Sequence, residues 1–233
     1  MNLDDFLTLA KTRRSVRSFD TKPVPADLID RLLEAARWAP SGFNLQPTHW
    51  VVVTDPQLKQ KLCPACMGQK QILQAPAVVV FCGDRHAYQN NMERSLDEDM
   101  KIGAINAKYR DVARNFMKLA FEQGPTGLGW IMKAFFAPAL RIFKPTPNIP
   151  AVHKQVWVAK QVMLAAMSFM LAARSAGLST VPMEGFDESR VKKLLGIPNH
   201  FIVPVLIPVG YSSGDHGIKS RLPFDSLTHR ERW

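Results

Sequence analysis

The sequence predicts an α+β fold in which helices dominate, and three observations favour this class. Short β-branched runs bounded by turn residues indicate buried strands at 49–55, 75–84 and 200–211. Segments with helical spacing lie between these runs without a regular βα alternation. Neither G-x-G-x-x-G after a strand nor G-x-x-x-x-G-K-[ST] occurs, which argues against the common nucleotide-binding loops. We therefore expect one α+β, three-layer domain over residues 1–233.

Start and stop signals place the helices. Acidic residues in the first turn favour a helix over 2–13. Pro25 opens a second amphipathic helix, which should end at Pro40-Ser41-Gly42. A long Ala- and Met-rich helix is expected over 151–176, with Gly177 as its C-terminal cap, and a shorter helix over 187–195.

A further apolar run, 178–183, is also expected as a strand. The run 200–211 contains Pro204 and Pro208. Because proline has no N–H to donate to a neighbouring strand, the two prolines predict an edge position for this strand.

Composition indicates a soluble globular protein, with 46% hydrophobic and 21% charged residues. The most apolar stretch, 162–173, is shorter than the roughly 20 residues that span a bilayer, so we expect a core or interface helix and no membrane span. The N-terminus shows no signal-peptide pattern, and three cysteines do not form a disulfide framework. A reduced, cytoplasmic protein is expected.

The formal net charge of +10 is compatible with nucleic acid, anionic lipid or a phosphorylated small molecule as a partner. No aromatic-flanked RNA motif or recognition helix supports nucleic acid, so none is expected as a partner. The six histidines match no H-x-x-x-H or H-E-x-x-H pattern, and no metal site is expected. The pair Cys63 and Cys66 follows a helical segment rather than a strand, which favours structural thiols over a thioredoxin-like site.

Four short stretches carry groups that suit a ligand. RRSVRSF at 13–19 places guanidinium groups beside hydroxyls, as a phosphate pocket requires, although a solvated basic turn is the commoner meaning of such a stretch. APSGFNLQP at 39–47, PMEGFD at 182–187 and KSRLP at 219–223 are each also compatible with an ordinary turn or tail. None of the four is diagnostic alone.

The segment 105–150 differs in texture, because it mixes basic residues with many aromatic ones. Such an excursion is compatible with a lid over a ligand site or with a helical pair packed on the body. A membrane-surface helix is a third, weaker alternative. The residues from 212 to 233 are expected to form a C-terminal tail.

Taken in order, RRSVRSF, APSGFNLQP, MGQKQILQAPAVVVFC, VPMEGFD and KSRLP resemble the FMN-dependent nitroreductase family. The resemblance extends from residue 5 to about 225. It implies a mostly antiparallel sheet wrapped by helices and an intertwined homodimer with two FMN sites at its interface. The long helix over 151–176 would form the centre of that dimer.

The resemblance also assigns cofactor-binding residues. Arg13, Arg14, Ser15 and Arg17 would hold the phosphate, ribityl chain and pyrimidine edge of FMN, and Lys219 and Arg221 would complete the phosphate site. Pro40, Ser41, Gly42 and Asn44 would come from the other subunit. Pro182 and Met183 lead into Glu184 and Gly185, whose backbone N–H groups would lie near flavin N5 and O4.

The sequence departs from some relatives before the second strand. Where those relatives carry an Asn and a Lys that touch the pyrimidine ring, this chain reads MGQKQI, with Gln71 at the Lys position and Gln69 as its neighbour. Glutamine still hydrogen-bonds but removes a positive charge near N1–O2, so a lower flavin potential is expected.

The function implied is two-step reduction with NADH or NADPH as donor and a nitroaromatic, quinone or similar acceptor as substrate. Because the flavin carries the chemistry, no catalytic acid–base pair is expected from the protein. Two alternatives stay open at this stage. One is another flavin chemistry on the same frame, namely reductive dehalogenation or flavin cleavage. The other is a non-catalytic FMN-binding or storage protein.

Overall fold

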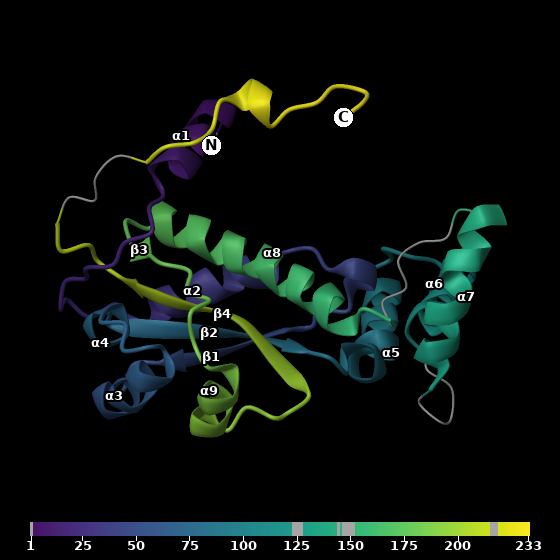
Figure 1. The fold of residues 1–233 in the computed structure, drawn as a ribbon, viewed down its shortest axis with the longest axis horizontal. Coiled ribbons are helices and arrows are strands. Elements are labelled where there is room, and N and C mark those ends of the chain that lie inside the picture. Colours follow the sequence, from purple (N-terminus) through teal and green to yellow (C-terminus); the bar gives the residue numbers. More distant parts are fainter. Residues whose placement is uncertain (1, 123–127, 144, 146–151, 215–218) are drawn as a thin grey trace.

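The fold centres on a four-stranded antiparallel sheet, seen in the computed structural model, which describes residues 2–122, 128–143, 145, 152–214 and 219–233 (Figure 1). The strand order is β1-β2-β4-β3, and each neighbouring pair is antiparallel. The strands are β1 (Thr48–Val53), β2 (Ala77–Asp84), β3 (Ser179–Thr180) and β4 (Phe201–Gly210). The α+β class and the antiparallel sheet expected from the sequence are confirmed.

Helices cover both faces of the sheet. On one face lie α2 (Ala26–Arg37) and the long α8 (Lys154–Ser175). On the other face lie α3 (Pro56–Ala65), α4 (Gln71–Gln74) and α9 (Glu188–Leu195). Alternating residues of β2 serve the two cores, since Val79 and Phe81 pack with α8 while Val78 and Val80 pack with α3 and α9. This sidedness produces a three-layer arrangement.

The helix α8 packs closely on the sheet along one side. A Cβ at Gly83 of β2 would lie 2.3 Å from Val158 Cγ1 and 2.9 Å from Val162 Cγ2, so this glycine permits the contact. By length and composition α8 is also the one helix among the described residues that could cross a membrane. Its sheet-facing residues, such as Phe169, are fully buried in the core, which is the environment expected for a core helix. Its outer side exposes Leu164 and Met167.

The edge position predicted for the strand with Pro204 and Pro208 is wrong, because β4 pairs with β2 on one side and β3 on the other. The prolines are tolerated for a local reason. Leu206 exchanges backbone hydrogen bonds with Met183, and the Pro208 carbonyl accepts from Val181 N–H, so the even-numbered residues face the β3 side. β3 is only two residues long, and the missing N–H groups are on this weakly paired side.

The strand expected over 178–183 is correspondingly shorter than predicted. Only Ser179–Thr180 forms β3, and Met183 adds an isolated bridge to Leu206. The other helix ends follow the sequence signals, since α8 ends at Ser175 and Gly177 has a φ of +75°.

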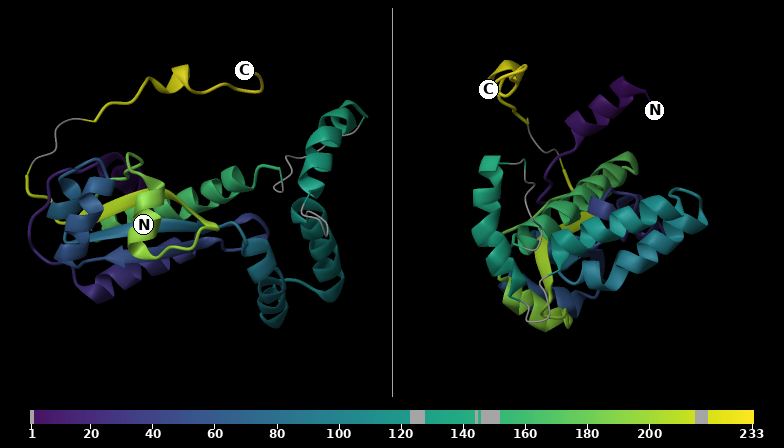
Figure 2. Two further views of the ribbon diagram at one scale, coloured as in Figure 1. Left: turned by 60° about the horizontal axis from the view of Figure 1, so that its bottom comes forward. Right: turned by 90° about the vertical axis from the view of Figure 1, so that its right-hand side faces the viewer.

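Two parts of the chain extend away from this body. The helix α1 (Leu3–Thr12) and the C-terminal tail, which contains the short helix η2 (Phe224–Ser226), stand out on the same side (Figure 2). No residue of α1 is buried. At the other end of α8 lie α5 (Ala87–Lys101), α6 (Ala107–Phe121) and α7 (Gly129–Phe143). The segment 105–150 is thus a helical pair where it is described, and parts of it lie outside the described residues.

Candidate functional site

The stretch after α1 is extended and anchored by its apolar residues. Val16 N–H donates to the Thr180 carbonyl at 3.0 Å, and both Val16 and Phe19 are buried. Ser15 and Arg17, on either side of Val16, are exposed. Alternation along the extended chain therefore turns the polar residues of RRSVRSF outward, while its apolar residues fix the segment to the sheet edge.

Cations from both ends of the chain converge at the end of α1. The Lys219 ammonium donates to the carbonyls of Ala10 and Arg13, each at 3.1 Å, and so brings the C-terminal segment against the arginines. Burial lowers the pKa of Arg13, and the positive charges of Arg221 and Arg14 lower it further. The pKa of Lys219 is lowered by desolvation and by the charges of Arg221, Arg13 and Arg14. These shifts record mutual repulsion among four cations.

The cluster lacks an internal counter-charge. Within the described part of the chain, none of Arg13, Arg14, Lys219 and Arg221 forms an ion pair. The Arg13 Nη1 atom is buried and has no hydrogen-bond partner there. A buried guanidinium nitrogen without an acceptor is costly unless a ligand supplies one. The arrangement is that of a site for an anion.

A cavity of about 380 Å³ opens beside these residues. Arg13 and Arg14 line it together with Thr12, Ser179 and Thr180. Arg174, from the last turn of α8, is a further lining residue and donates from Nε to Thr12 Oγ1 at 3.3 Å. Sequence reasoning missed Arg174, because a cation in the last turn of a helix is expected there for the helix dipole alone.

A second polar group joins MGQKQI to the Glu-Gly turn. Gln69 Nε2 donates to the Gly185 carbonyl at 2.8 Å, and Gln71 Nε2 donates to Gln69 Oε1 at 2.9 Å. Gln71 is 7% exposed. The two glutamines that take the place of Asn and Lys are therefore held as a chain of hydrogen bonds beside Gly185.

The Glu-Gly turn presents free backbone donors. Met183 is fixed by reciprocal hydrogen bonds with Leu206 of β4, and Pro182 precedes it. Glu184 and Gly185 follow, both exposed, and neither N–H has an acceptor among the described residues. Two adjacent free N–H groups on a turn anchored to the sheet suit an electron-rich ring edge.

The loop with Pro40, Ser41, Gly42 and Asn44 lies elsewhere. Gly42 N–H donates to Gln161 Oε1 at 2.8 Å, and a Cβ at Gly42 would lie 3.1 Å from the Trp157 ring. Arg174 of the basic cavity follows Gln161 by 13 helical residues, about 20 Å along α8. One chain therefore does not bring this loop to the basic cavity.

This loop is conformationally unusual and rigidly held. It contains the short helix η1 (Gly42–Asn44), and Phe43, Asn44 and Gln46 all have positive φ. Ser41 Oγ accepts from Gln46 N–H at 2.9 Å. A positive φ costs energy for a residue other than glycine, and such residues concentrate at binding sites. The loop also borders a larger cavity of about 520 Å³, which Pro40 and Ser41 line.

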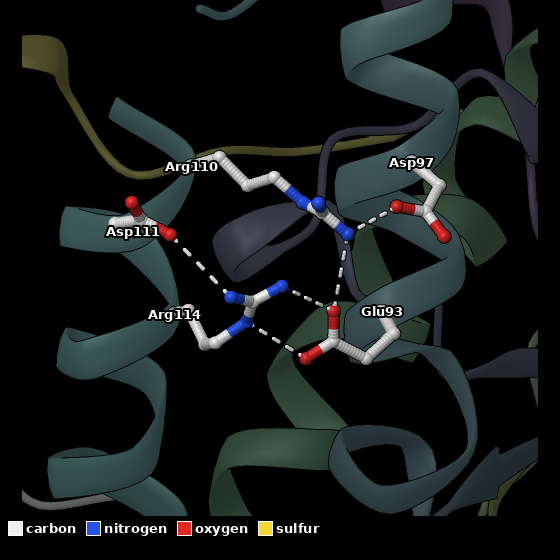
Figure 3. A network of polar contacts seen from close by, with 5 residues as sticks. All are labelled: Glu93, Asp97, Arg110, Asp111 and Arg114. Carbon is white, nitrogen blue, oxygen red and sulfur yellow. Dashed lines mark hydrogen bonds and ion pairs between the residues drawn. The ribbon is translucent and has the colours of Figure 1, made fainter. Parts of the chain in front are cut away.

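The helix α6 is tied to both α5 and this loop. Arg114 binds Glu93 through both its Nε and Nη2 atoms, at 2.8 and 2.7 Å, and Arg110 bridges Glu93 and Asp97 (Figure 3). At the end of α6, the Phe121 ring packs edge-on against Trp157, with ring centroids 4.9 Å apart. The ring centroids of Phe43 and Phe121 are 6.1 Å apart. The C-terminal end of α6 therefore packs against Phe43 of the 40–44 loop and against Trp157, which also contacts this loop.

The CPAC cysteines behave as structural residues. Cys63 and Cys66 are free and buried at the end of α3. Burial, with a contribution from Cys63, raises the pKa of Cys66 to about 12. A protonated, inaccessible thiol is neither a nucleophile nor a redox partner at neutral pH.

Comparison with known proteins identifies the family. A model described as "Nitroreductase family" matches residues 10–211. The chain belongs to the nitroreductase family. The matched range contains RRSVRSF, APSGFNLQP and PMEGFD, whereas KSRLP lies beyond it.

Relatives of this nitroreductase-family chain match along nearly its whole length. A protein named NADH dehydrogenase from Thermus thermophilus is 29% identical over 223 residues, which cover 96% of this chain and 94% of that protein. An oxygen-insensitive NAD(P)H nitroreductase from Enterobacter cloacae is 27% identical over 234 residues, covering 96% and 98%. A structure from Exiguobacterium sibiricum, solved in complex with FMN, has a TM-score of 0.76 and 23% identity and covers 99% of both chains. The nitroreductase-like fold is confirmed.

The residues of this nitroreductase-family chain fit an FMN molecule. The unpartnered Arg13 Nη1 and the uncompensated cations suit a phosphate, and the free N–H groups of Glu184 and Gly185 suit an isoalloxazine edge. Arg17 is exposed and has no hydrogen bond or ion pair among the described residues, so its assignment to the ring side stays a prediction. The assignment of Pro40, Ser41, Gly42 and Asn44 to the other subunit also stays a prediction.

Proposed function

We propose that this protein is a homodimeric FMN-dependent oxidoreductase that uses NADH or NADPH to reduce nitroaromatics, quinones or similar acceptors. The observation that carries the proposal is the cluster of four cations without a counter-charge, with Arg13 Nη1 buried and unpartnered. Family membership and the names of the relatives support the same conclusion. When bound, FMN supplies the redox chemistry, accepting a hydride from NAD(P)H and passing two electrons to the acceptor in a ping-pong sequence.

The chain's own residues would bind and orient the cofactor. Arg13, Arg14 and Arg221 would hold the phosphate, and Lys219 would keep the tail segment in place through its hydrogen bonds to the carbonyls of Ala10 and Arg13. Arg174 would add a further cation to the lining of the cavity. The Gln71–Gln69–Gly185 chain would fix the turn whose N–H groups donate to the ring. Glu184 and Gly185 act through their backbone, and no side chain is assigned an acid–base role.

A second copy of the chain would complete each site. The 40–44 loop is held at one end of α8 and the basic cavity lies at the other, so a two-fold partner is the natural source of the missing wall. The exposed apolar residues of α8, α1 and the tail, including Leu164, Phe6 and Phe224, supply the surface for such a partner. The helices α6 and α7 would then act as a lid over the acceptor position.

We also infer a cytoplasmic location. All three cysteines are free and buried, which suits a reducing compartment. The absence of a membrane partner and of nucleic acid stays an expectation.

An anaerobic titration tests the proposal. The full chain, loaded with FMN, should lose its visible flavin absorbance when NADPH or NADH is added, and it should recover that absorbance on addition of menadione or nitrofurazone. A yellow protein that neither donor bleaches would instead be a storage protein. Turnover of a halotyrosine but not of menadione or nitrofurazone would assign reductive dehalogenation. A chain that binds no FMN would overturn the proposal.

A further inference from the structure

Three possible metal ligands meet at the end of the sheet farthest from the basic cavity. Asp84 ends β2, His86 directly precedes α5, and His200 directly precedes β4. The strands bring them together, because Asp84 pairs in register with Phe201. One ligand atom from each of the three residues lies within 4.8 Å of the other two. From the geometry of this group we propose that Asp84, His86 and His200 form a binding site for a zinc-like divalent cation, independent of the FMN site.

The Asp84 carboxylate receives hydrogen bonds at both oxygens but has no lysine or arginine at ion-pair distance among the described residues. Asp84 is 2% exposed. Its Oδ1 accepts from His86 N–H at 2.6 Å, and its Oδ2 accepts from Asn90 Nδ2 at 2.8 Å. Among the described residues no lysine or arginine lies within ion-pair distance, and the nearest cationic candidate is His200 Nε2 at 3.8 Å. A buried carboxylate requires compensation, and a divalent cation would provide it.

The hydrogen bonds around Asp84 also resemble those that orient metal ligands. Each carboxylate oxygen keeps a lone pair after accepting one bond, so Asp84 remains available to an ion. Arg85 holds the His200 backbone in place, donating from Nε to the His200 carbonyl at 2.9 Å and from Nη2 to the Asn199 carbonyl at 2.7 Å. In known metal sites, hydrogen bonds of this kind fix the orientation of the residues that bind the metal.

The ligand chemistry selects the class of ion. Two imidazoles and one carboxylate suit Zn²⁺ and the neighbouring transition metals rather than Mg²⁺ or Ca²⁺, which prefer oxygen. In a tetrahedral zinc site with bonds of about 2.0–2.1 Å, ligand atoms lie about 3.3 Å apart, somewhat closer than the 3.8 Å between His200 and Asp84. Three protein ligands leave the fourth position to water.

One side chain must turn for the ion to bind. The His86 and His200 rings are stacked, with an interplanar angle of 2° and centroids 4.6 Å apart. Lone pairs lie in the ring planes, so two parallel rings do not point at one ion. His86 is exposed and free to rotate about its side-chain bonds, and its exposure also gives the ion an entry path.

Two cations lie near this group, Arg85, whose side chain donates to the Asn199 and His200 carbonyls, and Lys154, which has no such bond among the described residues. Lys154 begins α8 and interacts electrostatically with Asp84 from beyond ion-pair distance. Because its ammonium repels a cation, Lys154→Met is expected to strengthen metal binding. If Lys154 were instead the sole counter-charge of Asp84, the protein would bind no metal.

A bound ion would act as a structural clamp. It would join the end of β2 and the start of β4 to the start of α5, which leads into α6 and α7. The ion is expected to stabilise the attachment of α5, α6 and α7 to the sheet, and not to catalyse a reaction.

Calorimetric titration of the untagged, EDTA-treated full chain with ZnCl₂ tests the site. One ion per chain is expected, with a rise in melting temperature. Co²⁺ should give the visible spectrum of a four-coordinate site. His86→Ala, at an exposed position that should not disturb folding, and His200→Ala should each weaken zinc binding roughly tenfold or more.

The matched control is His229→Ala, since His229 stacks on Trp233 in the tail, away from this group. It should leave zinc binding unchanged. FMN affinity, measured on the same variants, should not change, which separates this proposal from the proposed function. No stoichiometric binding to the wild-type chain, or equal binding by His86→Ala and His200→Ala, would overturn the site.

Discussion

At the scale of single residues, Arg13 is a position where binding and stability should change in opposite directions. Arg13→Ala removes a proposed phosphate ligand but also relieves repulsion from Arg14 and Arg221. We expect FMN affinity to fall roughly tenfold or more, while the free energy of unfolding of the FMN-free protein stays equal or rises. Flavin-fluorescence titration and urea unfolding measure the two quantities.

The control for this experiment is Arg31→Ala, an exposed arginine on α2. It should alter neither quantity by more than a small amount. Wild-type FMN affinity in Arg13→Ala would place the phosphate elsewhere.

The buried thiols give a prediction of pH dependence. Burial raises the pKa of Cys66 and of Cys82 to about 12, from an ordinary value of 9.0. The unfolded chain therefore loses these protons first, so stability from this source is complete below about pH 9 and falls as pH rises toward 12. Iodoacetamide at pH 8 should leave both thiols unmodified in the folded protein and label them in urea, as read by mass spectrometry. Rapid native labelling of Cys66 would contradict its burial.

At the scale of elements, Glu93 is the carboxylate of α5 that binds both arginines of α6, while Asp97 binds Arg110 alone. Glu93 receives both Arg114 and Arg110, and its hydrogen bond to Arg114 is the main reason that its pKa is lowered. Glu93→Gln should raise amide hydrogen exchange in α6 a few-fold, without changing exchange in β2. Because a lowered carboxylate pKa gives stability that is lost as pH falls, acidification should have the same effect.

Glu98→Gln is the matched control for this substitution. Glu98 lies on the same helix, and among the described residues its side chain makes only an exposed pair with Lys101. Amide hydrogen exchange in α6 should be the same in Glu98→Gln as in the wild type. Equal protection of α6 in Glu93→Gln and the wild type would show that the Arg110–Asp97 pair and aromatic packing at Phe121 hold this helix without Glu93.

At the scale of the whole molecule, the exposed apolar side of α8 should be an interface. Leu164 and Met167 are each more than 40% exposed on a helix whose other side is core. Leu164→Glu should convert the proposed dimer to a monomer in light scattering. It should also abolish tight FMN binding, because the 40–44 loop would no longer reach the partner's cavity.

Leu73→Glu, at a similarly exposed leucine on α4, should leave the dimer intact. A wild-type chain that is monomeric and still binds FMN would contradict the shared site.

The sequence could predict the fold class and the motif order, but not every placement. The end of α2 at Arg37, shortly before Pro40, the end of α8 at Ser175, before Gly177, and the buried strand β2 follow from local signals that act over a few residues. The position of β4 in the sheet does not follow from local signals. Which strand the nitrogens of Pro204 and Pro208 face depends on the order of the strands. The predicted edge strand was wrong for that reason.

The site shows the same division. The sequence by itself determined which residue types lie at 13–17, 69–71, 184–185 and 219–221, and their order identified the family. Only the tertiary structure decided that Arg174 joins the basic cavity, that Gln71 reaches Gly185 through Gln69, and that Asp84, His86 and His200 meet. Local sequence fixes backbone preferences, whereas contacts between residues far apart in the chain exist only once strands pair and α8 packs on the sheet.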